Sequence, residues 1–404
     1  FKYKFLKYFK MKKLSILLLA FGLIFNSCER ELDIKSEASL DATSNLSSAD
    51  VDKLLTGAYK SIMEPSSYSY FNIMASEIMA DNYKPVKFQW YQVQYLHEHI
   101  VPEDDILLSY YYKDFYTAIT RANTILRVPS ATNAQKGKAR YVRALSHLRL
   151  YDLFERIPLI DETYVKGPIA PSSGKDVLAF IIEDLKYAKA NIEKFNVANA
   201  SLVQLTPTSE AATALLARVY RMNGDIQSAG KEAEELITSG KFSISDNPKV
   251  NTSEVILKFA GNLAEANGRW GGIMSYDART WNCFAAADDL LALISANDTR
   301  RNLFDFAQAP STNNYVFSNK YSPNDDSDLL VSRIPEMYLI SAEAGNTARL
   351  TELQAKRKSN LSLDDERRLE LSFEWVRWSD LVLKGEKYRL PYPISAKNAN
   401  PLLK

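Results

Sequence analysis

Apolar residues recur at helical spacing along most of the chain. Val51, Leu54 and Ala58 are separated by three and four residues, which predicts a helix that Pro65 ends. Similar spacing predicts further helices, which cover roughly residues 106–127, 134–154, 174–195, 208–222, 226–239, 285–295, 332–344 and 363–383. Alternation of apolar and polar residues, which is typical of a strand, is scarce outside residues 254–259. The pattern therefore predicts a mostly α fold.

Two of these helices also carry the spacing of a repeat. Small residues and a glycine occupy the relative positions of a tetratricopeptide helix pair, at Leu216, Ala217, Tyr220, Gly224 and Ala229. The small residues allow two helices to approach closely, and the glycine forms the turn between them. The aromatic and proline anchors of that repeat are missing. The segment therefore predicts a helical hairpin, either a tetratricopeptide-like pair or an alanine-rich hairpin of an ordinary bundle.

Residues 363–383 predict one long helix near the C-terminal end, which Gly385 ends. Two adjoining apolar stripes would bury about half of the helix circumference, and we assign Trp375 and Trp378 to core packing. On the remaining face we expect ion pairs between residues three positions apart, Arg367 with Glu370 and Glu374 with Arg377.

A different pattern precedes the helices. The basic residues 11–13 are followed by an unbroken apolar run over residues 14–25 and then by Asn26, Ser27 and Cys28. This order is typical of a secretory signal, and the run is shorter than the roughly 20 residues of a transmembrane helix. A cysteine directly after the small Ser27 favours a lipoprotein signal cut before Cys28, whose sulfur would carry the lipid. An ordinary secretory signal is the alternative.

These features divide the chain into three parts. We expect residues 1–27 to hold upstream sequence and the signal peptide, residues 28–48 to form a polar lipidated tether, and residues 49–404 to form one domain. Cys28 and Cys283 are the two cysteines of the sequence. An exported chain of this kind has no disulfide framework, so its stability must come from a large core.

Composition and charge exclude several classes of function. The sequence is 46% hydrophobic and 25% charged, which are ordinary globular values. Its net charge is +1 and it has no basic tail, so nothing indicates nucleic-acid binding. The 23 tyrosines suit core packing first and stacking against flat ligands second.

The C-terminal residues also carry a family resemblance. Residues 366–371 and 377–381, followed by Gly385, resemble the C-terminal signature of the SusD/RagB family, which are outer-membrane nutrient-binding lipoproteins of Bacteroidetes. The resemblance extends along nearly all the mature chain, in order, at residues 55–59, 118–123, 139–144, 214–220, 333–339 and 390–394. Two departures are the direct passage from Ala344 to Gly345, where the family usually continues the helix, and an end without the usual Gly-Tyr.

The resemblance implies a fold and a role. It implies a SusD-like scaffold of tetratricopeptide-like helix pairs with an irregular ligand-binding part, in which N-terminal and C-terminal family segments interleave. Such proteins capture oligosaccharides, or sometimes oligopeptides, and act as the lid of a TonB-dependent outer-membrane transporter of the SusC type. No bond is broken and no cofactor is implied. Acidic residues after Cys28 (Glu29, Glu31 and Asp33) are similar to the family's surface-export signal.

Loop residues with suitable chemistry are the candidates for ligand binding. Sugar rings present flat faces that stack on aromatic side chains, and polar side chains bond their hydroxyl groups. Three tryptophans lie in polar or glycine-containing connections, where binding residues concentrate: Trp90, Trp270 and Trp281. Possible hydroxyl-binding partners are Asp81, Asn82 and Tyr83.

Two other classes of function remain as alternatives. A glycosidase needs two carboxylates at a suitable separation, but we interpret the acidic residues around positions 98–105 as a solvated loop. His97, His99 and His147 do not complete a tetrahedral metal set, so no metal is expected. Motifs of phosphate loops, nucleophile elbows and Rossmann folds are missing. The second alternative is a tetratricopeptide-type adaptor that binds protein partners.

Overall fold

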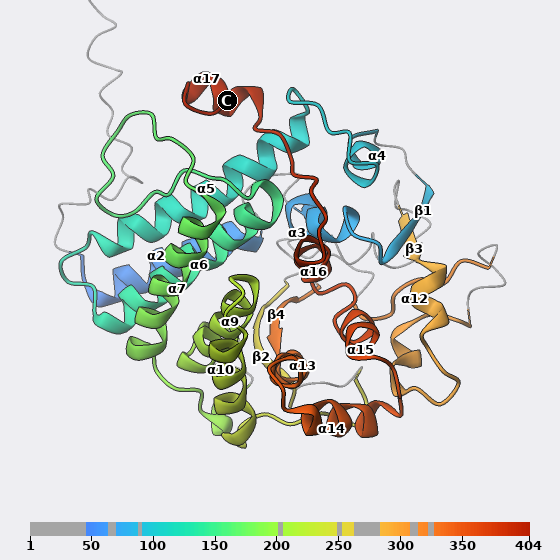
Figure 1. Cartoon of the computed structure of the whole chain (residues 1–404). Coiled ribbons are helices and arrows are strands. Elements are labelled where there is room, and N and C mark those ends of the chain that lie inside the picture. Colours follow the sequence, from blue (N-terminus) through green and yellow to red (C-terminus); the bar gives the residue numbers. More distant parts are fainter. Residues whose placement is uncertain are drawn as a thin grey trace, which may run out of the picture. The chain divides into compact units, whose positions relative to one another are not determined.

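The computed structural model describes residues 46–63, 70–87, 91–200, 205–248, 253–261, 283–307, 314–321 and 327–404 (Figure 1). All of them belong to one compact unit, Leu46–Lys404. The α-helices of the described residues are α2 (Ser48–Met63), α3 (Tyr70–Ile78), α4 (Tyr91–His97), α5 (Ile106–Leu126), α6 (Asn133–Phe154), α7 (Gly174–Asn191), α9 (Ser209–Met222), α10 (Ile226–Thr238), α12 (Asp288–Ala292), α13 (Ile334–Glu343), α14 (Thr347–Arg357), α15 (Leu363–Glu370), α16 (Arg377–Leu383) and α17 (Ile394–Ala399). The same residues contain the short 3₁₀ helices η1 (Val197–Asn199) and η2 (Thr299–Leu303). The fold is mostly α, as predicted.

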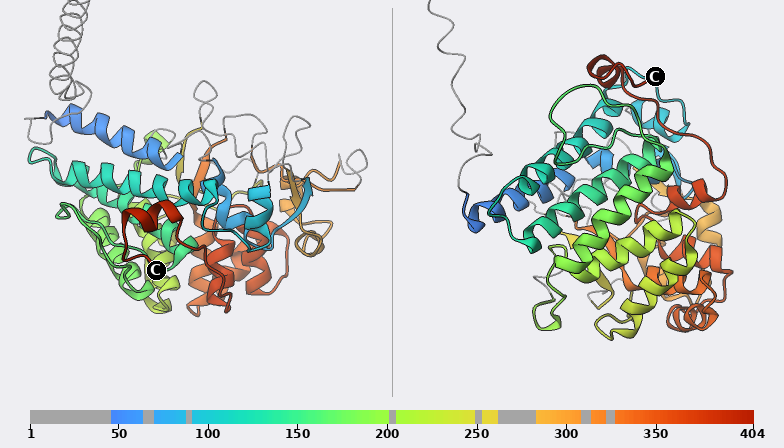
Figure 2. Two further views of the ribbon diagram at one scale, coloured as in Figure 1. Left: turned by 90° about the horizontal axis from the view of Figure 1, so that it is seen from above. Right: turned by 60° about the vertical axis from the view of Figure 1, so that its left-hand side comes forward.

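Helix pairs form the scaffold. Helices pack against one another in pairs: α2 with α5, α6 with α7, α9 with α10, and α13 with α14. Adjacent pairs also touch, through α5 with α6, α7 with α9, and α10 with α13. Figure 2 shows the green helices of this series running side by side. This arrangement confirms the predicted tetratricopeptide-like scaffold.

Small residues allow these helices to approach closely. In the predicted hairpin, Gly224 has a φ of +80°, and Asp225 caps the N-terminus of α10. The next contact, between α10 and α13, depends on Gly230. A Cβ atom added there would lie 2.4 Å from the Cβ of Ala344. The hairpin is thus a true scaffold element, and its second helix fits α13 only because residue 230 has no side chain.

Within the described ranges, four strands form two small antiparallel sheets. β2 (Val255–Phe259) pairs with β4 (Leu329–Arg333), and β1 (Tyr83–Lys87) pairs with β3 (Cys283–Ala286). β2 agrees with the strand that the alternation over residues 254–259 predicted. The predicted helices over 285–295 and 332–344 were wrong at their starts, because those residues are strands paired with partners far away in the sequence.

The predicted single helix over residues 363–383 is wrong. The chain forms α15, then a turn, then α16. Phe373 and Trp375 both have a φ of +67° in this turn, a backbone conformation that a helix cannot contain. The turn is held by distant side chains: the Trp375 N–H donates to Oε1 of Glu77 at 2.8 Å, and Arg149 donates to the Trp375 carbonyl at 3.1 Å. Helical spacing alone gave no sign of these contacts.

Packing of the two tryptophans is as expected, although Trp375 lies in the turn rather than in a helix. The exposed fractions of Trp375 and Trp378 are 1% and 0%. The indole N–H of Trp378 donates to the carbonyl of Asp152 at 2.9 Å. α16 ends at Leu383, and Gly385 follows with a φ of +108°. Both rings therefore fix the C-terminal segment to the core.

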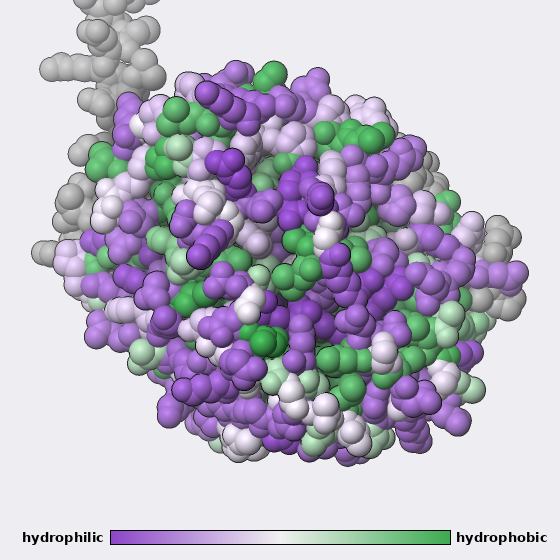
Figure 3. All heavy atoms as spheres, in the orientation of Figure 1, coloured by the Kyte–Doolittle hydropathy of each residue, from purple (hydrophilic) through white to green (hydrophobic). Residues whose placement is uncertain are grey.

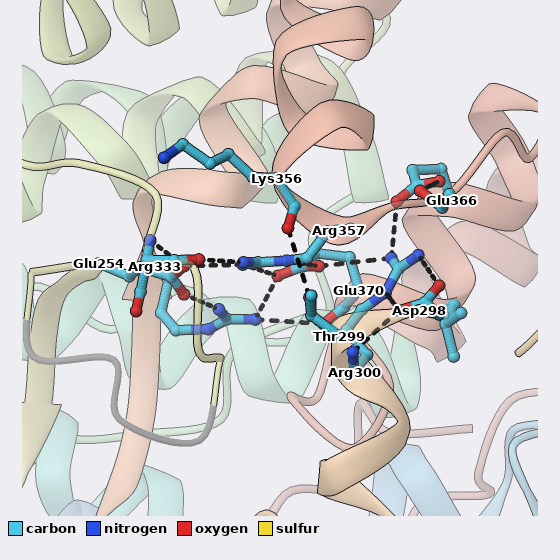
Figure 4. A network of polar contacts seen from close by, with 12 residues as sticks. Glu254, Asp298, Thr299, Arg300, Arg333, Lys356, Arg357, Glu366 and Glu370 are labelled. Carbon is cyan, nitrogen blue, oxygen red and sulfur yellow. Dashed lines mark hydrogen bonds and ion pairs between the residues drawn. The ribbon is translucent and has the colours of Figure 1, made fainter. Parts of the chain in front are cut away.

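The predicted ion pairs along the helix surface are also wrong, because these charged residues are buried. Glu370 contacts Arg357, Arg333 and Arg300, which come from α14, β4 and η2. Together with Glu254, Asp298, Glu366, Glu374 and Lys320, these residues form what we call the buried ion cluster (Figure 4). Figure 4 shows Arg357 and Glu370 in its centre. The cluster ties α14, α15 and the turn to the β2–β4 sheet.

None of the helices in the described part of the chain combines the length and the apolar character of a membrane span.

Candidate functional site

The β1–β3 ribbon joins two segments that contain sequence-predicted site residues. Its register pairs Tyr83 with Ala286 at one end and Lys87 with Cys283 at the other. Trp90 follows Lys87 by three residues, and Trp281 precedes Cys283 by two. Both tryptophans, as well as Trp270 and the proposed lipidation residue Cys28, lie outside the described residues. The described strands nevertheless show that the two chain segments leave the ribbon at the same end.

Asp81 lies just before β1, and two arginines of the C-terminal segment hold its carboxylate. Nε and Nη2 of Arg377 each donate to one carboxylate oxygen at 2.6 Å, and Arg368 lies 3.7 Å away. Burial raises the pKa of Asp81, but the hydrogen bonds and charges of these arginines outweigh it and bring the pKa below its ordinary value. The side chain is still 41% exposed. Asp81 is therefore an ionised carboxylate in a fixed orientation with one side open to solvent.

Asn82 and Tyr83 point into the protein. Asn82 is fully buried, and its Oδ1 accepts from Nε of Arg368 at 3.2 Å. The ring of Tyr83 is 3% exposed and stacks on Phe373, with ring centroids 4.6 Å apart. In this conformation neither side chain presents an atom to a ligand. Their observed contacts position β1 against the turn between α15 and α16.

Arg368 organises the residues around the ribbon. It donates to the carbonyl of Asp81 at 2.7 Å, to Asn82, and to Oδ2 of Asp289 at 2.9 Å. Lys84 of β1 contacts Asp288 of α12 at 2.5 Å. Sequence reasoning missed Arg368 and Arg377 as positioning residues. Their place within the family signature was the available signal, but a helix-surface pairing was expected for Arg377.

The histidines considered for a metal site, and Asp105 of the acidic loop, have internal surroundings or partners. His97 and His99 contact the carbonyls of Ile78 and Met79 at 3.2 and 2.8 Å. Burial lowers the pKa of His147 to about 3. Asp105 is the N-cap of α5 and accepts from two backbone N–H groups. Among the described residues, no three metal-binding side chains gather in one place.

An open groove of about 790 Å³ follows the outer face of α5 beside α17. Three tyrosines, three hydroxyl residues, Lys113 and Arg121 of α5 line it together with Ser395 and Ala396 of α17. None of these residues belongs to the ribbon. On the face shown in Figure 3, hydrophilic residues cover most of the surface and hydrophobic areas are small and separate.

Comparisons with known proteins agree with this architecture. A SusD-like family model, described as "Starch-binding associating with outer membrane", matches residues 32–221. A SusD-like protein of Bacteroides ovatus is 23% identical over 92% of this chain and 82% of its own length. SusD-like protein P38 of Formosa agariphila is 24% identical over 96% of this chain and 94% of its own. The chain is similar to SusD-like proteins along nearly its whole length.

Solved structures of SusD-like proteins share the fold of this chain. A SusD superfamily protein from Bacteroides thetaiotaomicron superposes with a TM-score of 0.76 at 20% identity, and the match covers 89% of this chain and 99% of that one. A protein described as a laminarin-binding SusD-like protein gives a TM-score of 0.74 at 19% identity, over 88% of this chain and 98% of that one.

In this chain the C-terminal signature has a positioning role. Arg367 donates from Nε to both carboxylate oxygens of Asp380 at 3.0 Å, which links α15 to α16. Arg368 and Arg377 hold Asp81 beside the ribbon. The signature residues therefore stabilise the turn between α15 and α16 and orient the loop that leads into β1.

Proposed function

We propose that the protein is a surface lipoprotein that captures oligosaccharide nutrients and delivers them to a TonB-dependent outer-membrane transporter of the SusC type, as its lid. Similarity to a family described as starch-binding and associated with the outer membrane carries this proposal. The laminarin-binding neighbour, which has the same fold, supports a glycan as the ligand class. In this account the protein binds the glycan without cleaving it.

The ribbon end is the proposed capture site. The segments that contain Trp90 and Trp281 leave the ribbon where Lys87 pairs with Cys283. Aromatic rings on these segments would stack on sugar faces, and Trp270 lies in the same connection as Trp281. Of the three polar candidates, Asp81 has the exposed carboxylate. It precedes β1 and therefore lies at the opposite end of the ribbon, where Tyr83 pairs with Ala286, so it would accept hydrogen bonds from the hydroxyls of an oligosaccharide long enough to span the ribbon.

Glycan and peptide arrays, followed by calorimetry on residues 29–404, test the ligand class. We expect retention of oligosaccharides and loss of binding in Trp90→Ala and Trp281→Ala. Lys175→Gln on α7 is the control, because this exposed side chain lies outside the ribbon. Retention of peptides alone would replace the ligand class with oligopeptides. Loss of all small ligands with a co-purifying protein would support the adaptor alternative instead.

The lipid anchor and the surface position need separate tests. Cys28→Ser should prevent incorporation of labelled palmitate and release the protein from the outer membrane. Protease shaving of intact cells should cleave the wild-type protein, and complete protection beside a cleaved surface control would contradict surface display. Co-purification with a TonB-dependent transporter tests the proposed partner.

A further inference from the structure

The groove along α5 has the size and composition of a ligand site that the proposed capture site does not explain. Its volume of about 790 Å³ lies within the range of small-molecule sites, roughly 300–1,000 Å³. Its lining residues on α5 recur every three or four positions from Ile106 to Arg121, so they share one face of the helix. Ser109 and Ser395, with hydroxyl oxygens 3.1 Å apart, join α5 to α17 at one end of the groove.

Arg121 is held in place by one edge of its guanidinium group. Nη1 donates to the carbonyl of Gly57 at 2.8 Å and to the hydroxyl of Ser61 at 2.5 Å, both on α2. A guanidinium group has five N–H donors, and these two bonds use the pair on Nη1. Nε and Nη2 have no partner among the described residues. That free edge matches the two oxygens of a carboxylate or sulfate.

The groove also carries the positive charges of Lys113 and Arg121, and its other described lining residues do not neutralise them. Lys113 lies eight residues before Arg121, which places the two cations about 12 Å apart along the helix axis. No carboxylate is among the described residues that line the groove, and Lys113 has no ion-pair partner in the described part of the chain. By contrast, Nε and Nη2 of Arg377 near the ribbon both donate to the carboxylate of Asp81.

Tyr116, Thr117 and Thr120 lie between the two cations along α5, and Tyr110 lies about one helical turn before Lys113. Tyr110 and Tyr116 are half-buried, and the hydroxyl of Tyr116 donates to the carbonyl of Pro158 at 2.8 Å, which fixes the ring. Thr117 and Thr120 donate their hydroxyl hydrogens to carbonyls one helical turn earlier, at 3.1 and 2.9 Å. Their oxygens remain available as acceptors. One ring for a sugar face and two acceptors for sugar hydroxyls therefore lie between the two cationic groups, and a second ring lies just beyond Lys113.

We propose that this groove is a second binding site, specific for acidic oligosaccharides. A carboxylate or sulfate on one sugar accepts two hydrogen bonds from Nε and Nη2 of Arg121, and Lys113 attracts a second anionic group along the chain. The tyrosines contact the sugar rings. The site does not require glycan capture at the ribbon end, so either proposal can fail alone.

Calorimetric titration with three probes tests the site: oligogalacturonate, a sulfated chondroitin oligosaccharide and a neutral laminarin oligosaccharide. Arg121→Gln should weaken binding of the acidic probe that the wild-type protein prefers by roughly 10- to 100-fold, because the variant loses a pair of charge-assisted hydrogen bonds. Lys113→Gln should weaken it by up to about fivefold and more strongly at low salt. Comparison of the two acidic probes identifies whether the carboxylate or the sulfate is preferred.

Controls separate this site from general charge effects and from the ribbon site. Lys175→Gln should leave all three affinities unchanged, and Trp90→Ala should leave acidic binding intact. Lys113→Gln keeps the test valid if Arg121→Gln destabilises the contact with α2, because Lys113 is exposed. The proposal is overturned if neither acidic probe binds, if Lys113→Gln leaves acidic affinity unchanged, or if Lys175→Gln reduces that affinity equally.

Discussion

Replacing Glu370 by glutamine should strongly destabilise the fold, because this carboxylate joins three buried arginines. Its side chain is 1% exposed, and it accepts from Nε and Nη2 of Arg357 at 2.8 and 2.9 Å. It also lies 3.2 Å from Arg333 and 3.4 Å from Arg300. Glutamine keeps the shape of the side chain but removes its charge, and it places an NH₂ group where a guanidinium needs an acceptor.

The size of the loss follows from the partners that remain. Removing one partner of a buried ion pair costs about 3–5 kcal/mol of unfolding free energy. Arg357 and Arg333 both keep Glu254, at 2.7 and 2.6 Å, and Arg333 also keeps Glu374. We therefore expect a loss near the lower end of the range, about 3 kcal/mol.

The loss should also depend on pH in a defined direction. Burial raises the pKa of Glu370, but the neighbouring arginines outweigh it and hold the pKa well below the ordinary value of 4.5. A group whose folded pKa is lowered stabilises the protein above its unfolded pKa, and that contribution is lost as the pH falls toward the folded pKa. The difference between wild type and Glu370→Gln should therefore be constant near neutral pH and shrink below about pH 4.5.

Urea unfolding followed by tryptophan fluorescence measures this difference. The matched control is Glu183→Gln, which removes an exposed pair with Lys186 whose side chains are 71% and 50% exposed, and should change stability by less than about 0.5 kcal/mol. A loss of about 1 kcal/mol or less for Glu370→Gln, or a difference that grows on acidification, would refute the reasoning.

Three further predictions follow from the structure. Burial raises the pKa of Glu77 to about 7, so the folded protein retains a proton that the unfolded chain releases above about pH 4.5, and stability should fall as the pH rises toward 7. In a series of Tm measurements against pH, Glu77→Gln should flatten this fall in stability, and an unchanged slope would contradict the prediction. Gly230→Ala should lower stability by about 1–3 kcal/mol, whereas Gly57→Ala, with no atom within 4 Å of the added Cβ, should raise it by about 0.5–1 kcal/mol; equal effects in urea unfolding would show that the close contact with α13 is relieved without cost. Arg377→Lys should weaken glycan binding at the ribbon by roughly tenfold in calorimetry, because lysine cannot hold both oxygens of Asp81, and an unchanged affinity would remove Asp81 from the proposed site.

The scaffold could be predicted from sequence because its signals are local. The helices of residues 106–154 and the hairpin of residues 208–239 bury stripes that repeat every three or four residues, and Gly224 marks the turn of the hairpin. The turn within residues 363–383 could not be predicted in this way. Its backbone is held by Glu77 and Arg149, which lie 298 and 226 positions away.

The candidate site shows the same division. Asp81 could be singled out because an acidic residue in a loop has chemistry of its own. Its neighbours Asn82 and Tyr83 have the same local chemistry, but tertiary packing buries them. The arginines that orient Asp81 were missed, since spacing of three residues suggested a local partner for Arg377 and the true partner lies 296 positions away.

Calorimetric titration of residues 29–404 with oligosaccharides selected on a glycan array, with chromatography of the recovered ligand, tests the central claim most directly. The account predicts saturable binding of an oligosaccharide that is recovered intact, and loss of that binding in Trp90→Ala and Trp281→Ala variants that remain folded. A folded wild-type protein that binds no oligosaccharide, or that returns the ligand cleaved, would contradict it.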